Sequence, residues 1–243
     1  QTAAAGWVSR ATPILQRQFD EDRSYSVSIV SEGGKLNLKR WFDGEDPRKI
    51  DFFKRWLEQL GMEFKDRETF VACLLDYIDP DTDYRTNGVE QRGDYMAANR
   101  ELESLEEIAR IPGSEALLQL PGWKESLTLY SQGQIDLLAA EPEILRLIPG
   151  FDDTRIQLLL NFRRGRDGEE GTADDPQVQS INQLLGQYLG FNKAQIQSLS
   201  GLVMINDKTV RITSTGQVGK VVRQVEVIAR KTAGPPTIIS WKE

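Results

Sequence analysis

The chain has 243 residues, enough for one large domain or two of ordinary size, and its 39% hydrophobic and 28% charged residues are typical of a folded globular protein. It contains no histidine, which removes Ser-His chemistry and the usual general base and so disfavours most classes of enzyme. Its net charge of −7 disfavours binding to nucleic acid or to anionic lipid.

The first segment of the chain is predicted to be helical. Apolar residues recur there at a roughly helical spacing: Trp7, Ile14, Leu15 and Phe19. This pattern is typical of the exposed tail of a longer helix. The chain begins at Gln1 and not at a methionine, so we expect that an upstream segment has been cut away. It contains no run of the roughly 18 to 20 apolar residues that a membrane span needs, and we expect these 243 residues to be soluble.

A β-hairpin and two helices are predicted next. Residues 24–29 alternate between serine and an apolar side chain, a Glu-Gly-Gly turn follows at 32–34, and apolar residues resume at 36 and 38. Apolar residues then fall on one helical face at 47–60, before Gly61, and again at 68–78. The single cysteine, Cys73, lies in the second of these runs, which predicts a buried free thiol and excludes an internal disulfide.

The middle of the chain is helical and its end returns to strands. Two acidic, turn-rich stretches, at 79–99 and 165–176, separate the helical patterns. From about residue 205 the pattern changes to alternating strands. We therefore predict an α+β fold in which an N-terminal helix and a small antiparallel sheet carry a large inserted α-helical domain. The predicted boundaries are 1–45 for the helix tail and first strands, 46–204 for the insert, and 205–243 for the closing strands.

Three segments resemble a known family. They are SEGGKLNLK at 31–39, LLDYIDPDTDYRTNGVEQRGDY at 74–95 and TLYSQGQIDLLAAEPEILRLIPG at 128–150. In this order they resemble the K-type minor pseudopilins of bacterial type II secretion, and the closing strands match as well. The second segment is the most specific because of its spacing. Departures include Tyr77 where the family usually has Trp, and Asp136-Leu137-Leu138 in place of an Asn-rich run.

This resemblance implies a structural subunit and not an enzyme. It implies the pseudopilin-like helix and sheet with an inserted α-domain. It also implies a place at the tip of the pseudopilus, where the protein initiates or caps the assembly with the I-type and J-type minor pseudopilins, and by extension with the H-type and major pseudopilins. A helix upstream of this chain would cross the inner membrane once and leave this part in the periplasm.

The first acidic loop is a candidate calcium site. Its carboxylates and one carboxamide are Asp76, Asp79, Asp81, Asp83, Asn87 and Glu90. Hard oxygen ligands suit calcium, and Gly88 permits the sharp turn that would bring the later oxygens back. The spacing is not that of an EF-hand, and the alternative is a solvated acidic turn. Family members bind calcium in the inserted domain, so the resemblance favours the metal.

The second acidic loop leaves two interpretations open. Its carboxylates are Asp167, Glu169, Glu170, Asp174 and Asp175, and three glycines free the backbone to wrap an ion or to form a flexible linker. One or two calcium ions are therefore predicted for the chain. Nothing in the sequence pairs these carboxylates across a sugar cleft, so no catalytic residue is assigned.

DNA binding is the alternative function. Residues 145–166 resemble a helix-hairpin-helix that ends in Arg163, Arg164 and Arg166. However, Asp152 and Asp153 stand at the turn, where they would repel a phosphate. We interpret the motif as a helical packing unit and expect no nucleic acid.

Apolar residues near the start are candidates for contacts with partner subunits. They are Trp7, Ile14, Leu15, Trp41 and Phe42, with Trp123 and Trp241 as further aromatic candidates. The alternative for each aromatic ring is core packing. If the adjacent Trp41 and Phe42 lay in a strand, they would point to opposite faces, and one would be left uncovered.

Overall fold

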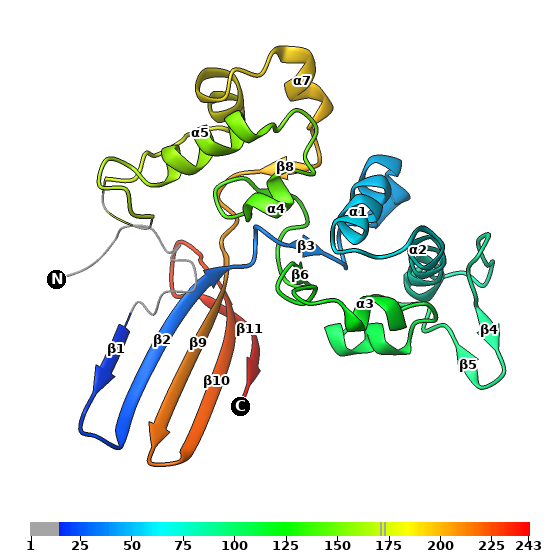
Figure 1. Cartoon of the computed structure of the whole chain (residues 1–243), viewed down its shortest axis with the longest axis horizontal. Helices are drawn as coiled ribbons and strands as arrows, with labels where there is room; N and C mark the ends of the chain where they lie inside the picture. Colours follow the sequence, from blue (N-terminus) through cyan, green and yellow to red (C-terminus); the bar gives the residue numbers. More distant parts are fainter. Residues whose placement is uncertain (1–14, 171, 173) are drawn as a thin grey trace. The chain divides into compact units, whose positions relative to one another are not determined.

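The computed structural model describes residues 15–170, 172 and 174–243. Lys35–Leu129 form one compact unit, and the described residues up to Gly34 and from Tyr130 form the other (Figure 1). We call them the helical unit and the sheet unit. Helices and an antiparallel sheet both occur, so the predicted α+β fold is confirmed. No helix in the described part of the chain is long and apolar enough to cross a membrane.

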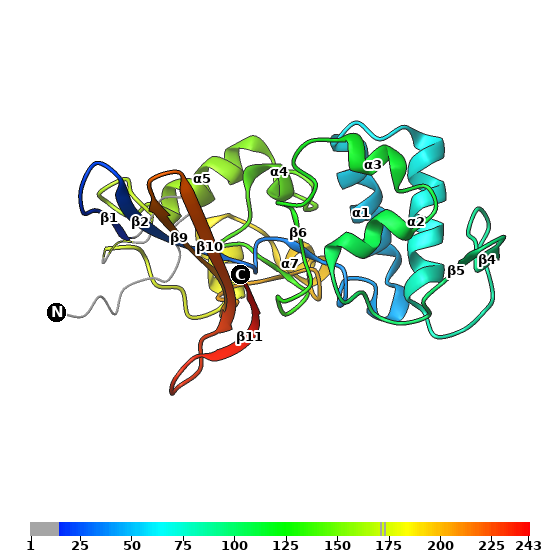
Figure 2. The same ribbon diagram turned by 90° about the horizontal axis from the view of Figure 1, so that it is seen from below.

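The sheet unit is built on five antiparallel strands whose order is β1-β2-β9-β10-β11 (Figures 1 and 2). Their bounds are Leu15–Gln18 (β1), Arg23–Ser31 (β2), Thr209–Val218 (β9), Val221–Arg230 (β10) and Thr237–Lys242 (β11). The predicted pairing of the closing strands with the early ones is confirmed, because β9 pairs with β2 from Val218↔Arg23 to Val210↔Ser31.

The residues between 130 and 208 belong to the same compact unit as the sheet. Their elements are β7 (Ile135–Asp136), α4 (Pro142–Leu145), α5 (Asp153–Arg163), α6 (Ile181–Gln183), the π-helical turn η3 (Leu184–Tyr188), α7 (Lys193–Ser198) and β8 (Val203–Met204). The boundaries predicted at residues 45 and 204 were placed where the sequence changes between helical and strand patterns. The two compact units are divided at other positions, after Gly34 and after Leu129. The boundaries at residues 45 and 204 stay a prediction.

The helical unit encloses an aromatic core. Its elements are β3 (Leu36–Asn37), η1 (Asp43–Glu45), α1 (Pro47–Gln59), α2 (Phe64–Ile78), β4 (Gln91–Arg92), β5 (Tyr95–Met96), η2 (Leu105–Arg110), α3 (Glu115–Gln119) and β6 (Leu127–Thr128). Helix α1 starts where the Asp46 carboxylate accepts the Arg48 N–H and Pro47 takes the first position, and Gly61, at φ +98°, follows its end. Phe53 packs on Trp56 and Phe70 between α1 and α2.

Two local predictions were wrong. Leu15–Gln18 form strand β1 and not a helix, because an apolar spacing of four residues, Leu15 to Phe19, fits a strand as well as a helix, and the Asp-Glu-Asp turn closes a hairpin onto β2. Trp7 and Ile14 lie outside the described residues. Residues 36–38 do not pair with β2 either: β3 pairs in parallel with β6, a contact that local sequence cannot reveal.

Candidate functional site

The first acidic loop folds back on the end of α2 around one arginine. Helix α2 holds Asp76 in its last turn with no exposed surface. The Arg85 guanidinium donates to Asp76 Oδ1 at 2.7 Å, to Asp79 Oδ2 at 2.5 Å and to Glu45 Oε1 at 2.5 Å. The Arg85 backbone N–H also donates to both Asp76 oxygens, at 3.2 Å each. Arg85 is thus the internal counter-charge of the loop.

Gly88 is required by a close approach in this loop. A Cβ on Gly88 would overlap Asp76 Oδ2. Its neighbour Asn87 has φ +69° and accepts the Cys73 thiol through its carbonyl at 3.6 Å. The prediction of a buried free thiol at Cys73 is confirmed, and burial raises the pKa of that thiol to about 11, which keeps it protonated at neutral pH.

Three buried oxygen atoms beside this arginine cluster accept no hydrogen bond from the described residues. They are Asp79 Oδ1, Glu90 Oε1 and Asn99 Oδ1. Burial raises the pKa of Asp79 and that of Glu90, and the nearby carboxylates of Asp76 and Asp81 raise both further. The loop therefore collects more negative charge than Arg85 neutralises. Besides these three acceptors, the buried Tyr95 hydroxyl, which can also donate, has no hydrogen-bond partner among the described residues.

The predicted ligands of the first loop separate into two groups. Asp76, Asp79 and Glu90 are drawn inward, whereas Asp83 and Asn87 are exposed. Asp81 is exposed too, although its carboxylate accepts the Asp83 N–H at 2.9 Å. In the described part of the chain, no three Asp, Glu or Cys side chains are already arranged around one point as metal ligands.

Arg85 and two further residues of the site were missed by the sequence analysis. Asn99 lies at the far end of the same loop, where its amide donates to the Asp81 carbonyl at 2.5 Å. Its φ of +48° places it in a conformation that asparagine tolerates better than most residues, so a turn signal was present. Glu45 precedes α1 and lies 40 residues from Arg85, so only the fold could bring them together.

The carboxylates of the second acidic loop mostly organise their own turn. Asp174 accepts the Thr172 hydroxyl at 2.7 Å and the backbone N–H groups of Arg166 and Asp167 at 2.7 and 3.2 Å. The Thr172 and Arg166 hydrogen bonds hold the pKa of Asp174 well below its usual range. Asp167 in turn accepts the Glu169 N–H at 2.8 Å. Gly171 and Ala173 lie outside the described residues, and an ion at this loop stays a prediction.

The apparent DNA-binding hairpin is used for packing. Asp152 caps α5 by accepting the Arg155 N–H at 2.8 Å, and Phe151 packs on Phe191. Arg163 is buried, and its guanidinium donates to the carbonyls of Leu137 and Ala140. That guanidinium is therefore engaged within the protein and not presented to a phosphate.

The aromatic pair near the start of the helical unit is also used for packing. Trp41 and Phe42 are 0% and 5% exposed. The Trp41 indole donates to the Lys49 carbonyl at 2.8 Å, and Phe42 contacts Phe53 edge to face. The expectation that one of the two rings would be uncovered is wrong, because both lie in the turn between β3 and η1 and not in a strand. Leu15, by contrast, is exposed on β1.

A pair of buried aspartates connects the segment around β7 to the loop that precedes β9. Asp136 and Asp207 are 3% and 8% exposed. Asp136 accepts the N–H groups of Leu138 and Asp207 at 2.9 and 2.7 Å, and Asp207 accepts those of Gln132 and Thr209, both at 2.7 Å. Burial raises the pKa of Asp136 to about 6.

Comparisons with known proteins match one segment of the chain to a family and the chain to a known fold. Residues 34–120 match the sequence profile of the family described as type II secretion system (T2SS), protein K. The fold is similar to one in the crystal structure of the GspK-GspI-GspJ complex from enterotoxigenic Escherichia coli type 2 secretion system. That match has a TM-score of 0.72 and 15% identity, and it covers 96% of this chain and 83% of the other. No curated protein matches the sequence.

Proposed function

We propose that this chain is a minor pseudopilin of the pseudopilus tip, because residues 34–120 match the protein K family of type II secretion systems and the chain shares the fold of the solved structure. The resemblance predicted from three segments is thereby confirmed. The observation that carries the proposal is the strand pairing, in which the two ends of the chain form one sheet and the helical unit lies between them in sequence. The similar solved chain was crystallised with GspI and GspJ.

The proposed role is structural. The chain would assemble with the I-type and J-type minor pseudopilins, and the bulk of its helical unit would prevent another subunit from stacking above it, which caps or initiates the assembly. Contacts with the H-type and major pseudopilins belong to the same proposal. So does anchorage in the inner membrane by a helix upstream of Gln1, which would leave this part in the periplasm.

Gel filtration of this chain with the matching I-type and J-type subunits tests the proposal. We expect the three to elute together, earlier than any of them alone. Separate elution at tens of micromolar, well above the Kd of a stable complex, would contradict it. The residues encoded upstream of Gln1 test the anchorage, because a prepilin-type leader and an apolar helix should be found there.

A calcium ion at the first acidic loop is a second part of the proposal. The support is chemical: three buried acceptor oxygens without donors, and carboxylates that raise one another's pKa. Asp79, Glu90 and Asn99 would hold the ion, with Asp81 beside them. A bound divalent cation would neutralise the excess charge and order the loop. The second loop, with Asp174 at its centre, would take a second ion only if its turn hydrogen bonds rearranged.

A further inference from the structure

The first acidic loop contains a pair of residues that can react with each other. Asn87 is the only asparagine of the chain that is followed by a glycine, Gly88. An asparagine loses its side-chain amide when the backbone nitrogen of the next residue attacks its side-chain carbonyl carbon, and asparagine is for this reason a thermolabile residue. Glycine hinders this attack least, because it has no side chain and leaves the backbone freest to move.

The side-chain amide of Asn87 is free to react. Asn87 is exposed, and its side chain forms no hydrogen bond with any described residue. Two other asparagines share its backbone conformation, since φ is +69° at Asn87, +48° at Asn99 and +62° at Asn206. The Asn99 amide donates to the Asp81 carbonyl, and Asn206 is followed by an aspartate. Of these three, Asn87 alone combines a free amide with a glycine after it.

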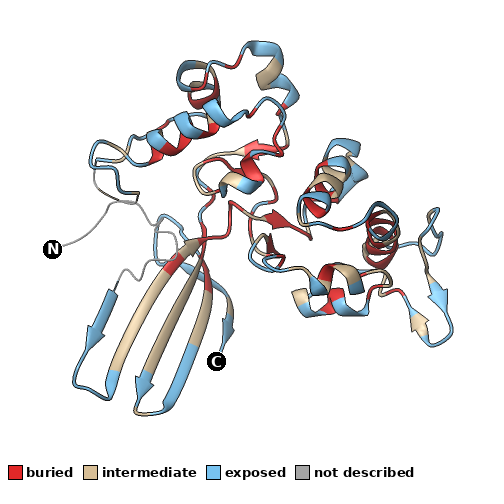
Figure 3. Cartoon of the chain, in the orientation of Figure 1, coloured by how far each residue is buried: buried red, intermediate tan, exposed pale blue. Residues whose placement is uncertain are grey.

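The folded turn slows the attack by holding the nitrogen that would make it. The Gly88 N–H donates to the Arg85 carbonyl at 2.8 Å, which closes a turn with Asn87 in third place at positive φ, as in a type II turn. This hydrogen bond must break before the nitrogen can reach the Asn87 side chain. Residues 80–87 are mostly exposed, as is the β4–β5 hairpin that follows, whereas α2 is mostly buried (Figure 3). Because exposed loops open at low free energy, the folded chain should still react.

We propose that Asn87 is a site of spontaneous deamidation, and that its isoaspartate product releases the first acidic loop from helix α2. The Gly88 nitrogen gives up its proton and bonds to the side-chain carbonyl carbon of Asn87. The bond from that carbon to the amide nitrogen breaks, and ammonia leaves with the proton. Water then opens the cyclic imide at either of its two carbonyl carbons. One opening gives aspartate, and the other gives isoaspartate, whose backbone is longer by a methylene group.

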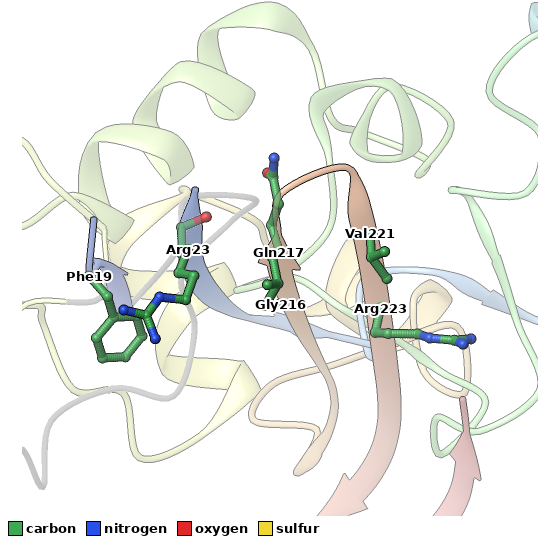
Figure 4. Close-up of a pocket in the computed structure, with 8 residues that line it drawn as sticks. Phe19, Arg23, Gly216, Gln217, Val221 and Arg223 are labelled. Carbon is green, nitrogen blue, oxygen red and sulfur yellow. The ribbon is translucent and has the colours of Figure 1, made fainter. Parts of the chain in front are cut away.

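The longer backbone does not fit between this turn and helix α2. A Cβ on Gly88 would overlap Asp76 Oδ2, so no room is left there for an added carbon. The Asn87 carbonyl also accepts the thiol of Cys73, on the same helix, at 3.6 Å. Not every glycine is so confined: Gly216 of β9 lines a hollow, and a Cβ there would meet no described atom within 4 Å (Figure 4). Isoaspartate at residue 87 should therefore push the loop away from α2.

The new carboxylate adds to an existing excess of negative charge, but this effect is the smaller one. Arg85 already pairs with three carboxylates, which are those of Asp76, Asp79 and Glu45. Another carboxylate at residue 87 would increase the repulsion among them. Because Asn87 is exposed, solvent and salt screen that repulsion. The change in the backbone, and not the added charge, should therefore account for most of the lost stability.

Storage of the folded chain at neutral pH for several weeks, followed by peptide mapping with mass spectrometry, tests the reaction. Conversion at Asn87 should exceed that at Asn99 and at Asn206 by about ten-fold or more, since neither of these is followed by glycine. The chain unfolded in urea should react faster at Asn87, because the turn no longer holds the Gly88 nitrogen. Conversion in the folded chain that is no greater at Asn87 than at the other two would overturn the proposal.

Melting of the separated products tests the effect on the loop. Anion exchange separates the deamidated chain by its added charge, and the isoaspartate fraction should melt about 5 °C or more below the unmodified chain. The matched control Asn87→Asp carries the same charge on an unchanged backbone and should melt within about 2 °C of wild type. Asn87→Gly suits the positive φ, cannot deamidate and should stay homogeneous. An isoaspartate fraction that melts no lower than Asn87→Asp would contradict the release of the loop.

Discussion

At the scale of single residues, buried carboxylates and close contacts control the stability of both units. The two carboxylate oxygens of Asp136 accept the N–H groups of Leu138 and Asp207, and the second of these hydrogen bonds joins β7 to the loop before β9. Burial raises the pKa of Asp136, and the two N–H groups that donate to its carboxylate oppose that rise. Gly88 shows the other constraint, since its backbone lies against Asp76 where no side chain fits.

The raised pKa of Asp136 predicts the direction of a pH effect. Burial raises this pKa from 3.8 to about 6, so the folded state binds the proton more tightly than the unfolded state. The contribution of Asp136 is therefore most favourable below pH 3.8 and is lost as the pH rises through about 6. Relative to Asp136→Asn, the wild type should lose about 2–3 kcal/mol of unfolding free energy between pH 4 and pH 7.5. Urea titrations at both pH values measure this, and a constant difference would contradict it.

A methyl group at residue 88 should destabilise the helical unit. Gly88→Ala places a Cβ against a fully buried carboxylate, which should cost about 1–3 kcal/mol in the free energy of unfolding. Gly234→Ala is the control, because nothing lies within 4 Å of its Cβ and its φ is not positive. Equal chemical denaturation midpoints for the two variants would mean that the loop does not pack on Asp76 as described.

At the scale of elements, local sequence patterns predicted the helices and strands whose conformation depends on residues close together in the chain. Strands β9 and β10 follow from their β-branched alternation, and α1 follows from Asp46-Pro47 before it and Gly61 after it. The parallel pairing of β3 with β6 joins residues about 90 apart and has no local signal. The acidic loop was found from its composition, but its division into inward and exposed carboxylates depends on Arg85, which composition did not single out.

Calcium should stabilise the helical unit through the first acidic loop. At about 100 times its Kd a ligand adds about 2.7 kcal/mol, which for a chain of this size corresponds to a rise in melting temperature of about 5–10 °C. Glu90→Gln should lose most of this rise yet be no less stable than wild type in EDTA, because it removes repulsion among the carboxylates. The control Asp83→Asn, at an exposed ligand candidate, should keep the rise. Identical melting curves with EDTA and millimolar calcium in wild type would refute the site.

At the scale of the whole molecule, each of the two units contains a pair of strands that come from opposite ends of that unit's sequence. In the helical unit the Leu36 N–H donates to the Ser126 carbonyl at 2.9 Å, and the Leu38 N–H donates to the Thr128 carbonyl at 3.0 Å. In the sheet unit Arg211 of β9 pairs with the buried Glu32 at 2.9 Å and with Glu226 of β10 at 2.5 Å. Each unit thus has its own closure and its own core.

The helical unit should therefore fold when it is expressed alone. A fragment of residues 35–129 retains the β3–β6 pair and the aromatic core around Phe53, so we expect a cooperative thermal transition by circular dichroism. The same fragment with Phe53→Ala should melt at a clearly lower temperature, because removing a fully buried Phe costs about 3–5 kcal/mol. A gradual, non-cooperative loss of signal in the unmodified fragment would contradict the division into two compact units.

The most direct test of the central claim is the mass of the assembly in solution. Light scattering during gel filtration should show that adding this chain to a mixture of its I-type and J-type partners raises the mass of the complex by 27.5 kDa or a whole multiple of it. That result would establish the chain as a minor pseudopilin that assembles with its sisters. An unchanged mass, with this chain eluting separately at 27.5 kDa, would contradict the account.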